Sequence, residues 1–229
     1  MDSRWVLLPI LLVILAFVVF NRSSFQNDHL LFIHIPKTAG SMIETQFEKY
    51  NYKVGKNGVY PRSDQVKCNG WHIPAKYDRS IRFSDYLTFA IVRDPLDRFI
   101  SELNYLATQD PTFIEKYRDI NQFIKEKLVE GSKDYDCHLI PQSEYLVDAY
   151  GDPVQNILRF ENLNEDLQKF IDIHKLSIKY SNERENQSKK VYGLKDLTPE
   201  SITSIKSYYL SDYLFLSNDD NKKFFISQK

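Results

Sequence analysis

The chain has 229 residues, a length that suits one domain with a single buried core. Its formal net charge of −1 excludes a protein that holds nucleic acid by overall positive charge, so a polyanion would have to meet a local patch. Cys68 and Cys137 permit one disulfide without requiring it. The chain has no Cys-x-x-Cys pair, which disfavours a zinc or redox site.

The chain begins with a short tail and an apolar run from Val6 to Phe20. At ~1.5 Å per residue the run spans about 22 Å, less than the ~30 Å core of a bilayer, although flanking residues extend it. No small-x-small cleavage site follows, so an uncleaved anchor is favoured over the competing cleaved signal peptide. The expected organisation is a tail over 1–5, a transmembrane anchor over 6–22, a polar stem over 23–28 and one folded domain over 29–229. Asn21 and Asn186 begin Asn-x-Ser glycosylation sequons.

The next apolar run, Leu30–Ile35, predicts a buried strand, and Pro36-Lys37-Thr38-Ala39-Gly40 follows it as a tight loop. Ser41 and Glu44 then have the spacing of a capping box, which predicts a helix to about Tyr50. A strand, a loop and a helix N-terminus in this order present backbone N–H groups and the positive end of the helix dipole, so they bind phosphate or sulfate. Lys37 adds a mobile charge, and the hydroxyls of Thr38 and Ser41 add donors.

This loop is not a Walker A loop, because its one glycine follows the lysine and none comes directly after the strand. The alternative is an ordinary turn between strand and helix in which Lys37 is solvated.

Residues 51–70 are polar and contain Gly55 and Gly58 before Pro61 and Gly70 at their end. They predict a loop with at most one short strand.

A second continuous apolar run, Tyr86–Val92, predicts a central strand of a parallel sheet. Asp94 and Pro95 suit the N-cap and first position of the helix that follows. Arg93 therefore stands at the carboxyl end of a strand, where open α/β sheets bind ligands. Ser101 lies about two turns into the helix, so that Arg93 and Ser101 can reach one phosphate.

The remaining chain alternates helical and extended patterns. A helix is expected over Asp119–Glu130, a strand over Val154–Phe160, a helix from Glu161 and a last helix that begins at Thr198 and Pro199. Residues 181–190 are polar and charged. Lys189 or Lys190 could meet a phosphate there, but a solvated loop is favoured.

The two motifs resemble those of Golgi-type carbohydrate sulfotransferases, which use 3′-phosphoadenylyl sulfate (PAPS). The resemblance covers most of the chain from about residue 29, and Arg93-Asp94-Pro95-x-x-Arg98-x-x-Ser101 matches the family's 3′-phosphate motif. It implies a single-domain, three-layer α/β fold with a central parallel sheet, similar to nucleotide kinases. It also implies sulfuryl transfer to a carbohydrate hydroxyl, 3′,5′-ADP as product and no required metal. The 5′-phosphosulfate would be held by Lys37 and by the amides of Thr38, Ala39, Gly40, Ser41 and Met42, and the 3′-phosphate by Arg93 and Ser101.

A general base is needed to deprotonate the attacking hydroxyl, and histidine has a suitable pKa. Cys68-Asn69-Gly70-Trp71-His72 resembles a Cys-Gly-x-His run of the heparan sulfate 6-O-sulfotransferases, so His72 is the expected base alongside Lys37 as a catalytic residue. The chain also resembles the related heparan sulfate 2-O-sulfotransferases. The alternative for His72 is a structural histidine beside Trp71. His138, in a His-x-x-Pro-Gln run, and Glu144 remain rival bases, whereas His34 is expected to be a satisfied core residue.

The resemblance further implies a single-pass type II protein of the Golgi membrane with a lumenal domain, or a microbial or viral equivalent. Its partners would be a glycan or glycosaminoglycan and the membrane, with no nucleic acid. Two rival functions remain: a P-loop-like nucleotide kinase or NTPase, which would need magnesium and an acidic residue at a second strand end, and a non-catalytic glycan-binding protein. The sequence leaves open the acceptor sugar, its hydroxyl and the oligomeric state.

Overall fold

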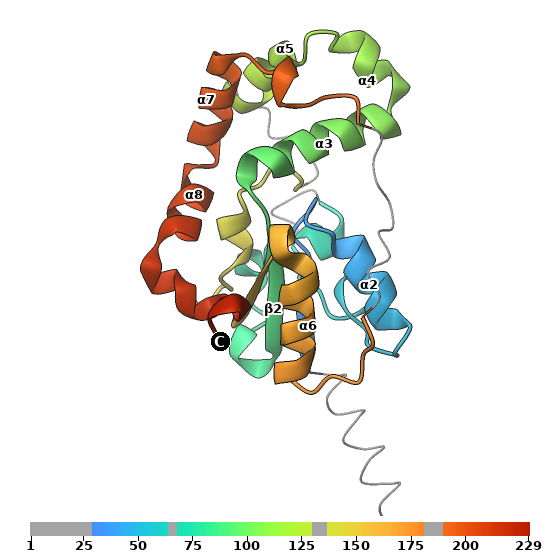
Figure 1. Cartoon of the computed structure of the whole chain (residues 1–229), viewed down its shortest axis with the longest axis vertical. Coiled ribbons are helices and arrows are strands. Elements are labelled where there is room, and N and C mark those ends of the chain that lie inside the picture. The colour runs from blue at the N-terminus through green and yellow to red at the C-terminus, as the bar shows by residue number, and fades with distance from the viewer. Residues whose placement is uncertain (1–28, 64–67, 130–136, 181–189) are drawn as a thin grey trace, which may run out of the picture.

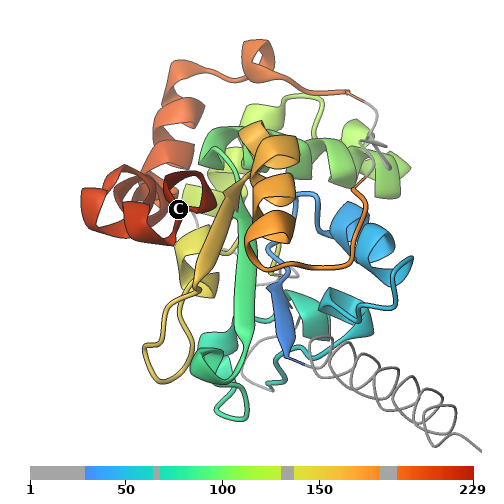
Figure 2. The same cartoon turned by 60° about the horizontal axis from the view of Figure 1, so that its bottom comes forward.

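The computed structural model describes residues 29–63, 68–129, 137–180 and 190–229. At its centre three parallel strands lie side by side in chain order, as Figure 2 shows: β1 (Leu30–Ile33), β2 (Leu87–Val92) and β3 (Asn156–Arg159). In the register of the sheet, Phe32 pairs with Phe89, and Ala90 pairs with Ile157. Because all three strands are parallel, their carboxyl ends meet at one edge of the sheet. The parallel sheet with its helices confirms the predicted α/β class.

Each strand leads into a helix. β1 is followed by α2 (Gly40–Glu48), β2 by α3 (Pro95–Gln109) and β3 by α6 (Leu163–Ile173). Four more helices complete the set of α-helices in the described residues: α4 (Pro111–Lys116), α5 (Ile120–Ile124), α7 (Pro199–Tyr208) and α8 (Leu210–Ser217). In Figure 1, α3, α4, α5 and α7 gather beyond the carboxyl ends of the strands.

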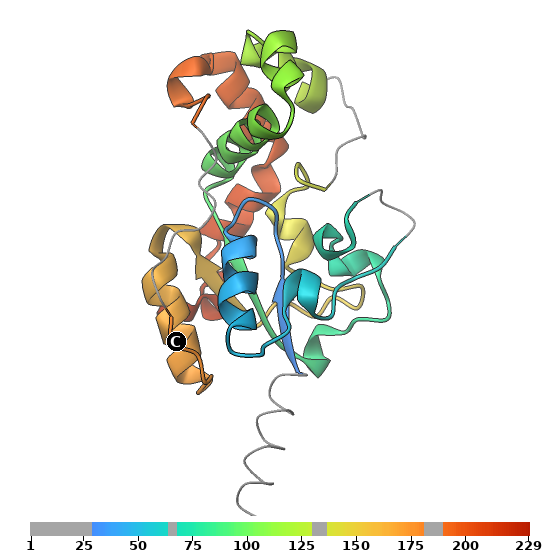
Figure 3. The same ribbon diagram turned by 90° about the vertical axis from the view of Figure 1, so that its right-hand side faces the viewer.

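The sheet is buried on both faces. On one face Phe32, Phe89 and Leu158 pack against Phe47 of α2 and Phe170 of α6. The alternate residues of the strands face the other way, as the period of two requires, and pack mainly against 3-10 turns and the C-terminal segment. Figure 3 shows α2 and α6 on one side and those turns on the other. A third apolar cluster joins α3, α5 and α7 around Phe123 and Tyr209.

Several predicted element boundaries are confirmed. Asp94 caps α3, since its carboxylate accepts a hydrogen bond of 2.9 Å from Asp97 N–H, and Pro95 occupies the first turn. Asp119 and Thr198 cap α5 and α7 in the same way. The three predicted strand segments each contain one strand of the sheet.

Three local expectations were wrong. The capping box of Ser41 and Glu44 does not form, because the N-cap residue is Ala39 in a left-handed conformation and Glu44 turns inward to other partners. The helix expected from Asp119 changes after α5 into a π-helical turn over Lys125–Val129. The last helix breaks at Tyr209, whose fully buried ring packs between α3 and α7. In the described part of 51–70 the chain forms 3-10 turns and no strand.

The predicted anchor over 6–22 and both glycosylation sequons lie outside the described residues. Within the part of the chain that the structure describes, no helix has the length and apolar character needed to cross a membrane.

Candidate active site

A cavity of about 1210 Å³ lies at the edge of the sheet where the strands end. Residues that follow each of the three strands line it, for example Lys37 after β1, Arg93 after β2 and Phe160 after β3. This is the edge at which open α/β sheets bind ligands. The cavity brings together every residue predicted for the site except Thr38: His72, Lys37, Ala39, Gly40, Ser41, Met42, Arg93 and Ser101.

The loop after β1 is held in an unusual backbone conformation. Lys37 has φ 68° and Ala39 has φ 73°, in the left-handed region that costs a residue with a side chain of order 1–3 kcal/mol. Thr38 is fully buried, and its hydroxyl donates a hydrogen bond of 2.8 Å to Ile35 O. That hydroxyl therefore braces the loop, whereas the sequence had suggested it as an anion donor.

A buried histidine supports the loop from beneath. A Cβ at Gly40 would lie 2.2 Å from Nε2 of His34, so residue 40 can approach this ring only without a side chain. His34 Nδ1 donates a hydrogen bond of 2.7 Å to Glu44 Oε1, which also accepts one of 2.9 Å from Lys56 N–H. His34 is thus a buried, hydrogen-bonded residue as predicted, and it also lines the cavity.

The Lys37 side chain lies against α3. Its Nζ sits 4.0 Å from the centroid of the Tyr105 ring, a distance at which an ammonium is attracted to the ring face. Burial lowers the pKa of Lys37, the nearby Glu102 carboxylate opposes that shift, and Arg93 adds to it. The loop lysine is therefore already placed inside the cavity, near a second cation.

The second motif meets the first directly. Arg93 Nη1 donates a hydrogen bond of 3.3 Å to Lys37 O, and its guanidinium lies 4.2 Å from the Phe160 ring centroid. The Arg93 backbone is clamped by Gln142, whose amide accepts from Arg93 N–H at 2.9 Å and donates to Arg93 O at 2.8 Å. Burial lowers the pKa of Arg93, although Asp97 and Glu161 partly compensate.

His72 stands in a row of three imidazoles. Its ring centroid is 4.8 Å from that of His34 on one side and 4.8 Å from that of His138 on the other, both edge to face. Its Nδ1 is buried and has no hydrogen-bond partner among the described residues. Burial, together with the charges of His34, His138 and Lys37, lowers the pKa of His72 to about 2. His72 is therefore neutral at physiological pH, and the same shift makes its ring a weaker proton acceptor than an ordinary imidazole.

The two rival bases differ in their positions. His138 lines the cavity, and its Nδ1 donates a hydrogen bond of 2.7 Å to Glu102 Oε2, with both residues buried. Glu144 forms an ion pair with Lys76 and does not line the cavity. The structure thus keeps His138 beside His72 and places Glu144 elsewhere. The role of His72 as base remains a prediction.

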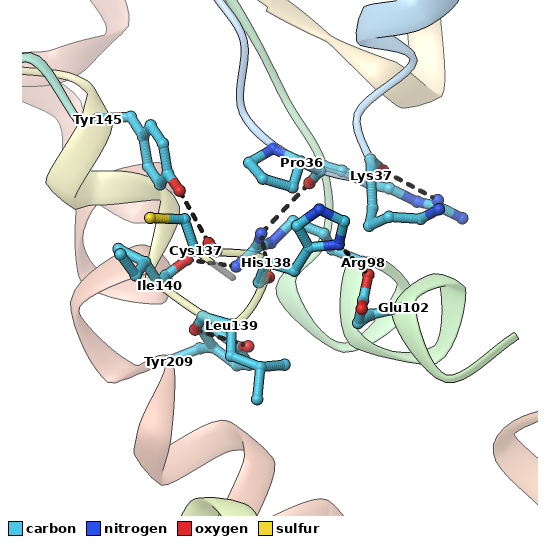
Figure 4. Close-up of polar contacts among 11 residues, drawn as sticks. Pro36, Lys37, Arg98, Glu102, Cys137, His138, Leu139, Ile140, Tyr145 and Tyr209 are labelled. Atoms are coloured by element: carbon cyan, nitrogen blue, oxygen red, sulfur yellow. Dashed lines mark hydrogen bonds and ion pairs between the residues drawn. The ribbon is translucent and has the colours of Figure 1, made fainter. Parts of the chain in front are cut away.

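Sequence reasoning missed the most buried residue of the second motif. Arg98 is 1% exposed, and its guanidinium donates hydrogen bonds to Pro36 O, His138 O and Ile140 O at 3.3, 3.1 and 2.6 Å (Figure 4). It ties the loop after β1 to the segment that carries His138. Its spacing in the motif was visible, but nothing in the sequence showed which carbonyls it would meet.

Two further points concern the chemistry available at the site. Cys68 and Cys137 form the disulfide that the sequence had left open. Among the described residues, no three His, Cys, Asp or Glu side chains are grouped so that they could hold a metal ion.

The fold and cavity together define an α/β protein with a lysine-bearing loop and a helix N-terminus at the strand ends, a facing arginine and a neutral histidine. A family model described as the sulfotransferase family matches residues 24–217, and this chain belongs to that family. Comparison with curated proteins gives no match, and neither does comparison with solved structures. Family membership supports sulfuryl transfer as the activity.

Proposed function

We propose that the protein transfers the sulfuryl group of PAPS to a hydroxyl of a carbohydrate. The observation that carries this proposal is the contact between Arg93 and Lys37, since it places both anion-binding motifs on one cavity with Ser101 and a neutral His72. PAPS carries phosphate at both its 3′ and 5′ positions. Its binding therefore needs two groups of cationic side chains close enough for one nucleotide to contact both. The three-layer, P-loop-like architecture implied by the resemblance belongs to the same proposal.

The residues present fit the donor. The N-terminus of α2 and the loop from Lys37 to Met42 would hold the 5′-phosphosulfate through backbone N–H groups and the helix dipole. Arg93 would hold the 3′-phosphate by charge-assisted hydrogen bonds, with the Ser101 hydroxyl as a second donor. Phe160, already stacked against Arg93, keeps that guanidinium on the cavity wall.

In the transfer step the acceptor oxygen attacks sulfur, and the bond between sulfur and the 5′-phosphate oxygen breaks. His72 would take the proton of the attacking hydroxyl, because its ring lines the cavity and the negative charge of a bound donor would raise its low pKa toward the range of a working base. Its Nδ1 is enclosed, so Nε2 is the ring nitrogen available for this proton. Lys37 would stabilise the negative charge that develops on the leaving phosphate oxygen.

A carbohydrate acceptor is supported by the aromatic side chains of the cavity. Trp71, Tyr105 and Tyr192 line the cavity, and flat rings with a polar edge are suited to pack against the faces of sugars. A glycan of the glycosaminoglycan type, as in the heparan sulfate enzymes that the His72 segment resembles, is the acceptor class we propose.

A lumenal, membrane-anchored placement is part of the proposal. The formed disulfide supports it, because disulfides persist in oxidising compartments such as the secretory lumen. The proposed anchor over residues 6–22 would then place the domain on that side of a Golgi or equivalent membrane.

The kinase alternative is less well supported. A nucleotide kinase would be expected to present an acidic metal ligand at a second strand end, and here β2 leads into Arg93. A glycan-binding protein without activity would not need a neutral His72 beside Lys37.

The proposed donor can be tested with purified full-length protein by thermal unfolding. A ligand at 100 times its Kd stabilises the folded state by about 2.7 kcal/mol, so a clear rise in Tm is expected with 3′,5′-ADP and none with ATP and magnesium. Equal stabilisation by both ligands would contradict the PAPS assignment. Labelled PAPS assayed against a panel of glycans then identifies the acceptor, and transfer to none of them would count against catalysis.

A further inference from the structure

The disulfide joins two parts of the site that are far apart in the chain. Cys68 and Cys137 are separated by 69 positions. Cys68 lies four residues before His72, and Cys137 immediately precedes His138. The bridge therefore links the segment of the proposed base to the segment whose histidine ring contacts it.

The backbone hydrogen bonds at His72 and Ile73 are local. The backbone N–H groups of His72 and Ile73 donate to Asn69 O and Gly70 O, so these two bonds stay within one 3-10 turn. The ring is packed against those of His34, His138 and Trp71, and its Nδ1 has no hydrogen-bond partner among the described residues.

The segment after Cys137, in contrast, is firmly held. Glu102 binds the His138 ring, Arg98 binds the His138 carbonyl, and the Tyr145 hydroxyl donates a hydrogen bond of 2.8 Å to Cys137 O. Figure 4 shows these contacts converging from α3 and from the following turn on one short stretch of chain. The bridge thus ties the 3-10 turn that carries His72 covalently to a firmly held stretch of chain.

We propose that the Cys68–Cys137 disulfide is a positioning element that holds the imidazole of His72 against His138 and inside the cavity, so that sulfate transfer, but not donor binding, depends on the oxidised bridge. The dependence of transfer rests on the proposed function. The donor-binding residues are fixed by other contacts: Thr38 braces the loop, and Gln142 clamps Arg93. Opening the bridge would therefore move the base while leaving the anion sites in place.

The kinetic test compares wild type with the double variant Cys68→Ser/Cys137→Ser. We expect kcat to fall at least tenfold, since small displacements of a reacting group cost up to about 100-fold in rate. We expect the Kd for 3′,5′-ADP to change less than twofold. Reduction of the wild type should reproduce the fall in kcat, whereas the same reductant should leave the double variant unaffected.

A stability control separates positioning from general weakening, because removal of a long-range disulfide also lowers Tm. Leu167→Ala, on α6, removes a fully buried side chain that does not line the cavity. Assayed well below its Tm, this variant should retain wild-type kcat despite its lower stability. If kcat falls equally in both variants, or falls together with donor affinity in the double variant, the disulfide has no positioning role.

An NMR titration of the His72 ring tests the positioning without relying on activity. In the bridged protein the His72 ring is packed between His34 and His138, near Lys37. Glu44 and Glu102 accept hydrogen bonds from those two imidazoles. The His72 ring should therefore not titrate above pH 4.5. In the double variant the released ring should titrate closer to the ordinary histidine value. An unchanged titration would overturn the positioning role. If the titration shifts in the double variant as expected but the wild type transfers no sulfate, the proposed function is overturned and the positioning role is not.

Discussion

Arg93 Nη1 lies 3.3 Å from the carbonyl oxygen of Lys37, although the two residues are 56 positions apart in the chain. The contact arises because β1 and β2 are adjacent and parallel, so the residues after each strand emerge at the same edge of the sheet. It brings the two sequences that are predicted to bind anions together in one cavity. The predictions below test what each part of that site contributes.

Removal of the Arg93 charge should weaken the binding only of ligands that carry a 3′-phosphate. A charge-assisted hydrogen bond contributes about 1.5–3 kcal/mol, so Arg93→Ala should weaken binding of 3′,5′-ADP by about 10- to 100-fold. Binding of 5′-AMP, which lacks the 3′-phosphate, should change little, and Ser101→Ala should show the same selectivity to a smaller extent. Calorimetry with both nucleotides measures this. Equal losses for the two ligands would place Arg93 elsewhere in the site.

Lys37 and His72 should be required for transfer but not for folding. Lys37→Ala removes the charge proposed to stabilise the leaving oxygen and His72→Ala removes the proposed base, so each should lower kcat by about 100-fold or more. His29→Ala is a matched control, because His29 is exposed and does not line the cavity. Transfer of labelled sulfate and circular dichroism provide the two readouts. A variant with full activity would remove its residue from the mechanism.

Protonation of His72 should destabilise the fold in mild acid. The folded pKa of about 2 lies below the ordinary value of 6.5, so below pH 6.5 the unfolded chain binds a proton that the folded protein does not. The free energy of unfolding therefore decreases as pH falls. His72 alone accounts for a decrease of about 2 kcal/mol between pH 7.5 and pH 5. Urea unfolding should show that loss in the wild type, and His72→Asn should reduce it by that amount. Parallel pH dependences in the two proteins would show that His72 titrates normally.

The close approach of Gly40 to His34 should appear as coupling between the two positions. Gly40→Ala would push a methyl group to 2.2 Å from His34 Nε2, and such overpacking costs about 1–3 kcal/mol. In a His34→Ala background the ring is absent, so the same substitution should cost at least about 1 kcal/mol less. Gly193→Ala is the control, because the nearest atom to its Cβ would be 3.9 Å away. Additive free energies of unfolding would refute the contact.

Asn104 should hold one wall of the cavity. Its side-chain oxygen accepts from Val191 N–H and Tyr192 N–H at 2.6 and 2.9 Å, and its amide donates to Tyr192 O at 2.9 Å. Asn104→Ala should cost about 1–3 kcal/mol of stability and speed hydrogen exchange at these two amides. Thr108→Ala, one turn further along α3, removes only a bond within the helix and should leave that exchange unchanged. Exchange that does not respond to Asn104→Ala would show that other contacts hold the wall.

The sequence by itself determined the features that depend on neighbours along the chain. The apolar runs predicted the strands, Asp94 and Pro95 predicted the start of α3, and the loop after β1 predicted an anion site at a helix N-terminus. Such features follow from backbone conformations and hydrogen bonds within a few residues, which local residue types decide. The capping-box pattern of Ser41 and Glu44 predicted wrongly. Glu44 instead accepts hydrogen bonds from His34 and from the Lys56 amide inside the protein.

Only the tertiary structure decided how these parts meet. The row of three imidazoles, the Arg98 ties and the disulfide join positions tens of residues apart. Their distances depend on how the helices pack on the sheet, and no short pattern encodes that packing. His72 could be named as a candidate from the sequence, but its lowered pKa follows mainly from burial beside two other imidazoles and Lys37. That environment exists only once the chain has folded.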